Sequence, residues 1–157
     1  MSATISFPER AALVRRASAL LCLRLGWSAV HEFSLPSGRR ADLLALRADG
    51  GFAIIEVKSG VRDFQTDMKW REYRDYCDAL YFAVDADFPR EMLPEDAGLM
   101  VADTGYAEVL REAPAHALAP ARRRALLHGF AMLAAGRLAA WEDPAGVAGL
   151  RAALRVE

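Results

Sequence analysis

The sequence predicts a single α/β domain built on a mixed sheet that carries helices on its faces. Segments with helical or strand periodicity follow one another in the order α-β-β-β-α-β, and a β-hairpin and C-terminal helices come after them. This order favours a mixed sheet over a doubly wound parallel one. With 54% hydrophobic residues, a chain of 157 residues can bury a substantial core.

The first helix is expected to begin after Ser6 and to run to Gly26. Ser6 is a suitable N-cap, Pro8 suits the first turn, and Glu9 completes a capping box with Ser6. Apolar residues recur at helical spacing along the segment, and Gly26 can end it. The residues that show this spacing are Leu13, Ala17, Leu20, Leu21 and Leu25.

Three strands are predicted to follow this helix. Residues 27–35 alternate as a strand, and Pro36-Ser37-Gly38 breaks the pattern. Residues 40–47 and 52–58 read as two further strands that are joined by a tight turn at residues 48–51. These two strands are apolar on both faces, which indicates a central position in the sheet.

The second half of the chain continues the same alternation. After Gly60 a helix of mixed polarity is predicted over residues 61–77, and a buried strand over residues 79–85. A small hairpin turns at Thr104-Gly105. The remaining expected elements are strands at 98–103 and 106–113, a short linker at 114–120, and two helices from Pro120 onward that are split near Asp143–Gly146.

Composition limits the class of protein. One domain is expected over residues 1–157, with a core at about 8–112 and C-terminal helices at about 119–155. The apolar runs are too short for a membrane span, and the N-terminus does not read as a secretion signal. Cys22 and Cys77 are expected to be reduced packing residues, which fits a cytoplasmic protein. A net charge of −1 leaves room for a local basic face.

Three charges interrupt the two central strands. Asp42 shares a strand face with Leu44, and Glu56 and Lys58 share a face of the next strand. If the hairpin closes at residues 49–51, Asp42 lies opposite Glu56 and Lys58 at one end of the sheet. Two carboxylates, helped by the Val57 carbonyl, would form a hard-oxygen site for Mg²⁺ or Mn²⁺.

Lysine is rare in this chain, which strengthens that interpretation. Lys58 and Lys69 are the only lysines, beside 18 arginines. A compact ammonium at position 58 can contact a phosphate oxygen or orient a water, so the set suits metal-assisted phosphodiester hydrolysis. The spacing is equally compatible with a cross-strand salt bridge on a solvated face.

The chain resembles the PD-(D/E)XK, or restriction-endonuclease-like, nuclease superfamily. Its α-β-β-β-α-β order carries Asp42 on the second strand and Glu56-Val57-Lys58 on the third, although Ala41 stands where the superfamily name has proline. More closely, the chain is similar to the MmcB-like bacterial DNA repair proteins from Pro8 to about Arg124. The stretches that carry this similarity are "SGRRADLLAL", "IIEVKSG", "DFQTDMKWREYRDYCDALYFAVD" and "ADTGYAEVLRE".

The resemblance implies a nuclease-like fold and a role in DNA repair. Many superfamily members also use a glutamate on the first helix, and Glu9 is the matching position here. It is either a further metal ligand or only the capping-box acceptor. Resolvase-like relatives work as dimers, so a homodimer is expected by analogy.

Several polar residues beside the proposed site are candidates for DNA contact. Arg39 and Arg40 precede Asp42 in a loop and are either phosphate contacts or part of a solvated turn. Ser59 opens a turn that lets a backbone approach, and Gln65 and Lys69 are expected one helical turn apart. Arg122-Arg123-Arg124 is either a DNA contact or a charged helix face, and the stripe of Trp70, Tyr73 and Cys77 favours core packing over base stacking. Asp67 is expected to pair with Arg71.

The function predicted from these observations is a Mg²⁺-dependent DNA endonuclease in DNA repair. Asp42 and Glu56 would hold the metal ion, with Glu9 as a further ligand unless it serves only the helix cap, and Lys58 would serve the phosphate and the water. The rival is a non-catalytic DNA-binding or scaffold component of a repair complex that does not depend on metal. A third interpretation is an interaction domain without DNA, which leaves the three charges only a salt-bridge role.

Overall fold

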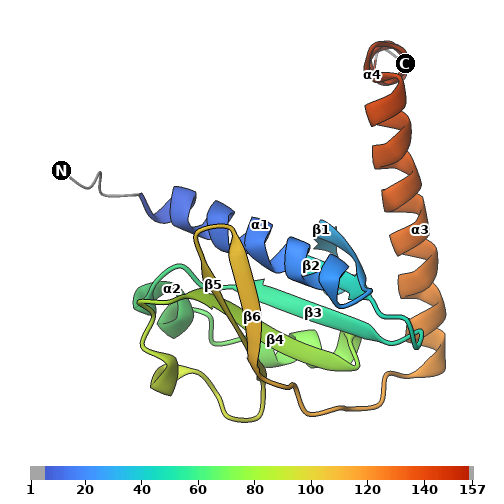
Figure 1. Ribbon diagram of the computed structural model, residues 1–157. Coiled ribbons are helices and arrows are strands. Elements are labelled where there is room, and N and C mark those ends of the chain that lie inside the picture. Colours follow the sequence, from blue (N-terminus) through green and yellow to red (C-terminus); the bar gives the residue numbers. More distant parts are fainter. Residues whose placement is uncertain (1–5, 156–157) are drawn as a thin grey trace.

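A computed structural model describes residues 6–155 and confirms the mixed α/β fold (Figure 1). One sheet contains six strands in the order β1-β2-β3-β4-β5-β6. The strands are β1 Ser28–Ser34, β2 Arg40–Leu46, β3 Phe52–Val57, β4 Ala79–Asp85, β5 Gly98–Asp103 and β6 Tyr106–Arg111. The helices are α1 Phe7–Arg24, α2 Val61–Thr66, α3 Pro120–Glu142 and α4 Pro144–Ala153, with short 3-10 helices η1 Trp70–Tyr76 and η2 Arg90–Met92.

The sheet mixes parallel and antiparallel pairs because its connections differ in length. β1, β2 and β3 pair antiparallel in sequence, as do β5 and β6. The strand β4 runs parallel to both β3 and β5, because longer segments separate these strands in the chain. Because β3 and β4 are parallel, their C-terminal ends lie side by side. The chain continues from that end of β3, at Val57, into α2.

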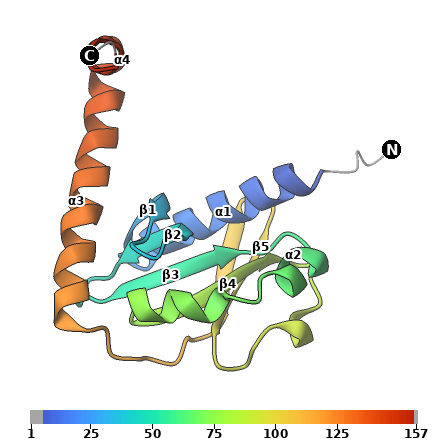
Figure 2. The ribbon, with the colours of Figure 1, turned by 180° about the vertical axis from the view of Figure 1, so that it is seen from behind.

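Both faces of the sheet are covered. α1 packs on one face, where Val14 and Leu21 meet Leu43 and Ile55. The segment of α2 and η1 lies on the opposite face, as Figure 2 shows from behind, and Trp70 packs there with other buried apolar residues. The central strands are therefore apolar on both sides, as the sequence indicates.

The start of α1 has the predicted capping box. Ser6 accepts from the Glu9 N–H, and the Glu9 carboxylate accepts from the Ser6 N–H at 2.9 Å and from its hydroxyl at 2.7 Å. Gly26 follows the helix with a φ of 74°, in the left-handed region that glycine tolerates. Cys22 and Cys77 are both buried and free, in agreement with their expected packing role.

The prediction of one helix over residues 61–77 is wrong. α2 ends at Thr66, Asp67 leaves the helical region with a ψ of 74°, and the chain resumes as the 3-10 helix η1. Aspartate competes for backbone hydrogen bonds and is a poor residue for a helix interior. Because a 3-10 helix has three residues per turn, η1 directs Trp70 and Tyr73 toward the core.

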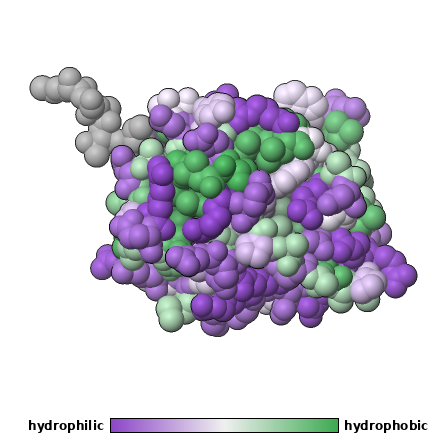
Figure 3. Space-filling view, turned by 60° about the horizontal axis from the view of Figure 1, so that its bottom comes forward, coloured by the Kyte–Doolittle hydropathy of each residue, from purple (hydrophilic) through white to green (hydrophobic). Residues whose placement is uncertain are grey.

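The C-terminal helices are confirmed and leave the sheet at the β1 side. α3 packs its first half on the sheet through Leu126 and Phe130 and then projects away from it, with α4 at its far end (Figure 1). None of the helices described for residues 6–155 combines the length and apolarity of a bilayer-crossing segment. The face in Figure 3 is mainly hydrophilic, with one continuous hydrophobic area.

Candidate active site

The antiparallel pairing of β2 and β3 stops where the two acidic side chains begin. Paired residues run from Leu46↔Phe52 to Leu43↔Ile55. Beyond this point the Asp42 N–H donates to Glu56 Oε1 at 3.1 Å, and the Val57 N–H donates to Asp42 Oδ2 at 2.8 Å. Two side chains thus take the place of main-chain acceptors, so the strands separate here and both carboxylates are held in fixed positions.

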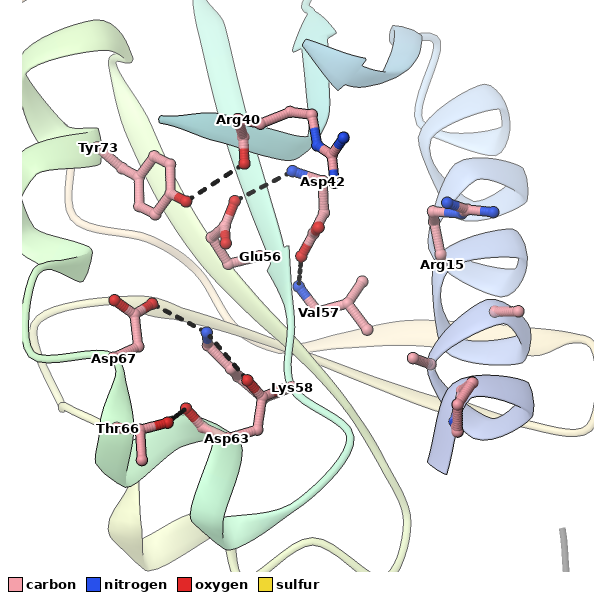
Figure 4. A pocket seen from close by; sticks show the side chains of 13 residues that line it. Arg15, Arg40, Asp42, Glu56, Val57, Lys58, Asp63, Thr66, Asp67 and Tyr73 are labelled. Atoms are coloured by element: carbon pink, nitrogen blue, oxygen red, sulfur yellow. Dashed lines mark hydrogen bonds and ion pairs between the residues drawn. The ribbon is translucent and has the colours of Figure 1, made fainter. Parts of the chain in front are cut away.

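These carboxylates line a cavity of about 560 Å³ that is open to solvent. α1 forms one wall, and the segment from α2 to η1 forms the other (Figure 4). Its lining residues are Pro8, Ala11, Ala12, Arg15, Arg40, Asp42, Glu56, Val57, Lys58, Asp63, Thr66, Asp67 and Tyr73. The predicted cluster of Asp42, Glu56 and Lys58 is therefore assembled at the end of the sheet.

Burial disfavours negative charge on both carboxylates. Burial and the neighbouring Asp42 raise the pKa of Glu56 to about 8. Burial likewise raises the pKa of Asp42 above its ordinary value. The pKa of the nearby Tyr73 phenol is also raised, by burial and by Glu56. A positive charge placed between the two carboxylates would favour the ionised form of both.

Lys58 is buried, with its side chain 6% exposed, and it is already paired. Its Nζ donates to Asp67 Oδ2 at 2.9 Å and lies 3.9 Å from Asp63 Oδ1. Burial alone would raise the pKa of Asp67, but the hydrogen bond and charge of Lys58 outweigh it and lower that pKa. The expected pairing of Asp67 with Arg71 is wrong, because the helix ends before Asp67 and its carboxylate turns inward to Lys58.

Glu32 on β1 lies at the other side of Asp42. Pairing between β1 and β2 includes His31↔Leu43 and Phe33↔Ala41 but skips Glu32. Glu32 has a φ of 53°, a left-handed conformation that costs a residue other than glycine on the order of 1–3 kcal/mol. Its carboxylate lies 3.8 Å from Arg15 and 4.0 Å from Arg40. The sheet is therefore irregular on both sides of Asp42.

Glu9 lies outside this cavity lining. It is exposed, and both hydrogen bonds of its carboxylate go to Ser6, which lowers its pKa. α1 instead directs Arg15 into the cavity, about one and two-thirds turns further along the helix. The position of Glu9 matches the capping interpretation, and its role as a metal ligand stays a prediction.

The residues expected to contact DNA are placed differently from one another. Arg40 lines the cavity and is exposed. Arg39 is engaged by Glu72 at 2.9 Å and by Asp67 at 3.4 Å. Ser59 lies on the neighbouring surface beside Asp63, and its N–H donates to that carboxylate at 3.4 Å.

Gln65 and Lys69 are exposed and are not among the residues that line the cavity. The expected spacing of one helical turn between them does not exist, because α2 ends at Thr66. Their proposed contact with DNA stays a prediction.

Burial and ion pairing decide the roles of the aromatic stripe and of one arginine in the triplet. Trp70, Tyr73 and Cys77 are buried, which confirms their use in the core. Arg123 forms two hydrogen bonds with the Asp78 carboxylate, at 2.6 and 2.8 Å. Its neighbours Arg122 and Arg124 lie on the exposed surface of α3.

Arg15, Asp63 and Asp67 are cavity residues that sequence reasoning did not assign to the site. Asp63 and Asp67 carried a signal, since they lie four residues apart in the segment that follows Lys58. Arg15 carried none, because one arginine among 18 on a helix reads as surface charge.

The donor set fits a hard divalent cation that keeps several waters. Among residues 6–155, no group of three or more His, Cys, Asp or Glu side chains stands ready around one point. Asp42 Oδ1 and Glu56 Oε2 have no hydrogen-bond partner within residues 6–155. Both residues line the cavity together with Val57. Mg²⁺ commonly uses one or two carboxylates and waters, so these two oxygens suffice for it.

Comparisons with known proteins agree with this architecture. A family model described as DNA repair protein MmcB-like matches residues 2–145. A solved structure of SPO1766, a protein of unknown function from Silicibacter pomeroyi, is 40% identical, with a TM-score of 0.84. The similarity covers 93% of this chain and 97% of that one. A search of curated proteins found no significant match.

The fold and the site define an α/β protein with paired carboxylates and a lysine at the splayed end of a mixed sheet. The family match covers most of the chain. The chain belongs to the MmcB-like family of DNA repair proteins.

Proposed function

We propose that this protein is a metal-dependent DNA endonuclease of the PD-(D/E)XK type that acts in DNA repair. The observation that carries the proposal is the placement of Asp42 and Glu56, which replace main-chain acceptors at the end of β2–β3. Each presents to an open cavity one oxygen that accepts no hydrogen bond from residues 6–155. Without a cation, ionising these two neighbouring carboxylates costs free energy, as their raised pKa values indicate. A bound cation would offset that cost.

In this proposal Asp42 and Glu56 hold Mg²⁺ or Mn²⁺, and the Val57 carbonyl is a further ligand. The metal supplies a water of lowered pKa and positive charge for the phosphoryl oxygens. Lys58 approaches the phosphate from the same cavity, and Asp67 positions its ammonium. Two subunits would be needed to cut two strands, so a homodimer is part of the proposal.

The decisive variant is Glu56→Gln, which removes the charge but can still accept the Asp42 N–H bond. We expect cleavage of a DNA panel with nicked, flapped, branched and single-stranded members to fall by at least about 100-fold, because metal charge stabilisation is worth several kcal/mol. Glu108→Gln is the matched control, since Glu108 is exposed on β6. Cleavage by the Glu56→Gln variant at the rate of wild type would overturn the assignment.

Metal binding is measured separately by calorimetry with Mg²⁺ and with Mn²⁺. We expect wild type to bind and Asp42→Asn to lose binding. If neither protein binds metal, even with DNA present, the endonuclease proposal fails.

One observation favours a second candidate, a non-catalytic DNA-binding component of a repair complex. The ion pair of Lys58 with Asp67 at 2.9 Å gives the lysine a structural role that needs no metal. This candidate predicts DNA binding that is unchanged by EDTA and no cleavage with any metal. Partner capture from a repair complex would then become the next measurement.

A further inference from the structure

Two arginines stand at the cavity that holds the paired carboxylates. Arg15 comes from α1 and Arg40 from β2, and both line the cavity with Asp42. Figure 4 shows Arg40 beside Asp42 and Arg15 across from it on α1. Arg15 lies near enough to Asp42 for its charge to oppose the rise in the Asp42 pKa. These two residues, named here the arginine pair, are drawn together by the fold from distant parts of the chain.

The charge balance of the cavity gives the arginine pair its importance. Four acidic and three basic side chains line the cavity. Of the three basic groups, Lys58 is engaged by Asp67 at 2.9 Å. A phosphate that enters an acidic cavity meets repulsion, and the arginine pair supplies the cationic groups at the solvent side that can offset it.

In the structure, Glu32 lies within ion-pair distance of both members of the arginine pair. Its carboxylate lies 3.8 Å from Arg15 and 4.0 Å from Arg40, and the three side chains are 45%, 40% and 64% exposed in that order. Ion pairs this long and this exposed are weak and screened by salt. An arginine forms shorter, two-pronged hydrogen bonds with phosphate, so a phosphate can displace the Glu32 carboxylate.

The backbone of Glu32 is unusual in a way that fits this role. Its φ is 53°, and the β1–β2 pairing skips this residue. A left-handed residue other than glycine within a strand is uncommon and persists only where the surroundings hold it. The irregularity separates Glu32 from the ordinary strand pairing, at the position next to Asp42.

We propose that Arg15 and Arg40 form the phosphate-binding subsite of the cavity, and that Glu32 occupies this subsite in place of phosphate until DNA binds. The ligand is a phosphodiester of the DNA backbone. This inference rests on the proposed function for the identity of the ligand, but it does not require cleavage. It assigns roles to Arg15 and Glu32, which the sequence did not indicate.

The test measures binding of a fluorescein-labelled forked DNA duplex by fluorescence anisotropy in EDTA, so that no DNA is cut. Affinity is measured from about 50 to about 200 mM KCl for each protein. The variants are Arg15→Ala, Arg40→Ala, the double variant of these two, Glu32→Gln and the triple variant, whose affinity is compared with that of the double variant. The control is Arg16→Ala, because Arg16 is exposed at the next position of α1 and is not a lining residue of the cavity.

We expect Arg15→Ala and Arg40→Ala each to weaken binding and to flatten the dependence of log affinity on log salt by about one unit. Glu32→Gln should strengthen binding several-fold at the lowest salt concentration. That gain should disappear in the triple variant, because Glu32 then has no arginine pair to occupy. Arg16→Ala should change the affinity and the salt dependence only slightly, as expected for the loss of one positive charge outside the cavity.

Three results overturn the inference. Unchanged affinity and salt slope in the two arginine variants would remove the subsite. An equal gain in DNA affinity from Glu32→Gln with and without the arginine pair would show that Glu32 acts only through its negative charge and does not occupy the subsite. Absence of wild-type binding in EDTA would remove the inference alone, because the proposed function depends on metal and is tested with metal present. Binding without cleavage removes only the endonuclease activity and leaves these variants to decide the subsite.

Discussion

At the residue scale, Glu56 is the clearest example of a side chain kept at a cost to stability. It is 3% exposed, and burial and Asp42 raise its pKa to about 8. Its folded pKa therefore lies above its ordinary value of 4.5. Ionising it in the folded protein is unfavourable, so its contribution to stability falls as pH rises from 4.5 to about 8.

Glu56→Gln should therefore raise the free energy of unfolding above about pH 8, by at least about 1 kcal/mol, in metal-free buffer. Below pH 4.5 the two proteins should be equally stable, because Glu56 is then protonated in both the folded and the unfolded state. Urea unfolding at a series of pH values measures this difference. Added Mg²⁺ should narrow it by stabilising wild type alone, and parallel curves at every pH would contradict the prediction.

At the element scale, a part-buried ion pair helps to hold α3 against the sheet. Arg123 binds the Asp78 carboxylate with two hydrogen bonds, and the same carboxylate accepts from the Phe52 N–H at 2.7 Å. Asp78 precedes β4 and Phe52 begins β3, so one side chain joins three elements. An arginine that reads as surface charge in the sequence is thus a structural anchor.

Arg123→Gln should destabilise the protein by about 1–3 kcal/mol, because it leaves the Asp78 carboxylate buried without its cation. Burial would raise the pKa of Asp78, but Arg123 and the Phe52 N–H outweigh it and lower that pKa. The stabilisation is therefore present above pH 3.8 and lost as pH falls below it. Urea unfolding at neutral and acidic pH tests this, with exposed Arg124→Gln as control; equal stability of the two variants at neutral pH would refute it.

At the scale of the whole molecule, the outer part of the C-terminal helices contributes little to the buried core. α3 contributes Leu126 and Phe130 to the core, whereas Trp141 near its end is 84% exposed. α4 follows at the far end and contributes no buried residue. The site lies near α2, at the end of β3 that points away from α3 (Figures 1 and 2).

Deletion of residues 143–157 should leave the thermal unfolding midpoint nearly unchanged, because it removes no buried core residue of the described chain. Deletion from residue 125 onward is the control, and it should unfold the protein by exposing the core that Leu126 and Phe130 cover. Circular dichroism during heating measures both. A large loss of stability on the shorter deletion would show that α4 stabilises the sheet.

The sequence by itself determined the order and type of most elements. It also indicated three residues of the site, Asp42, Glu56 and Lys58. Periodicity and turn residues are local signals, so they placed β2, β3, β4 and the hairpin of β5 and β6 near their observed bounds. The side-chain period of two in strands was enough to bring Asp42 and Glu56 together. The capping box at Ser6 and Glu9 is equally local.

Only the tertiary structure decided which charges face the cavity and how they pair. Aspartate is locally a poor residue for a helix interior, but the contacts of Asp67 with Lys58 and Arg39, formed where the predicted helix over residues 61–77 breaks, exist only in the folded protein. Arg15 and Glu32 meet only after α1 has packed on the sheet. Long-range pairing and burial set these positions, since a charge is costly inside a protein unless the fold brings it a partner.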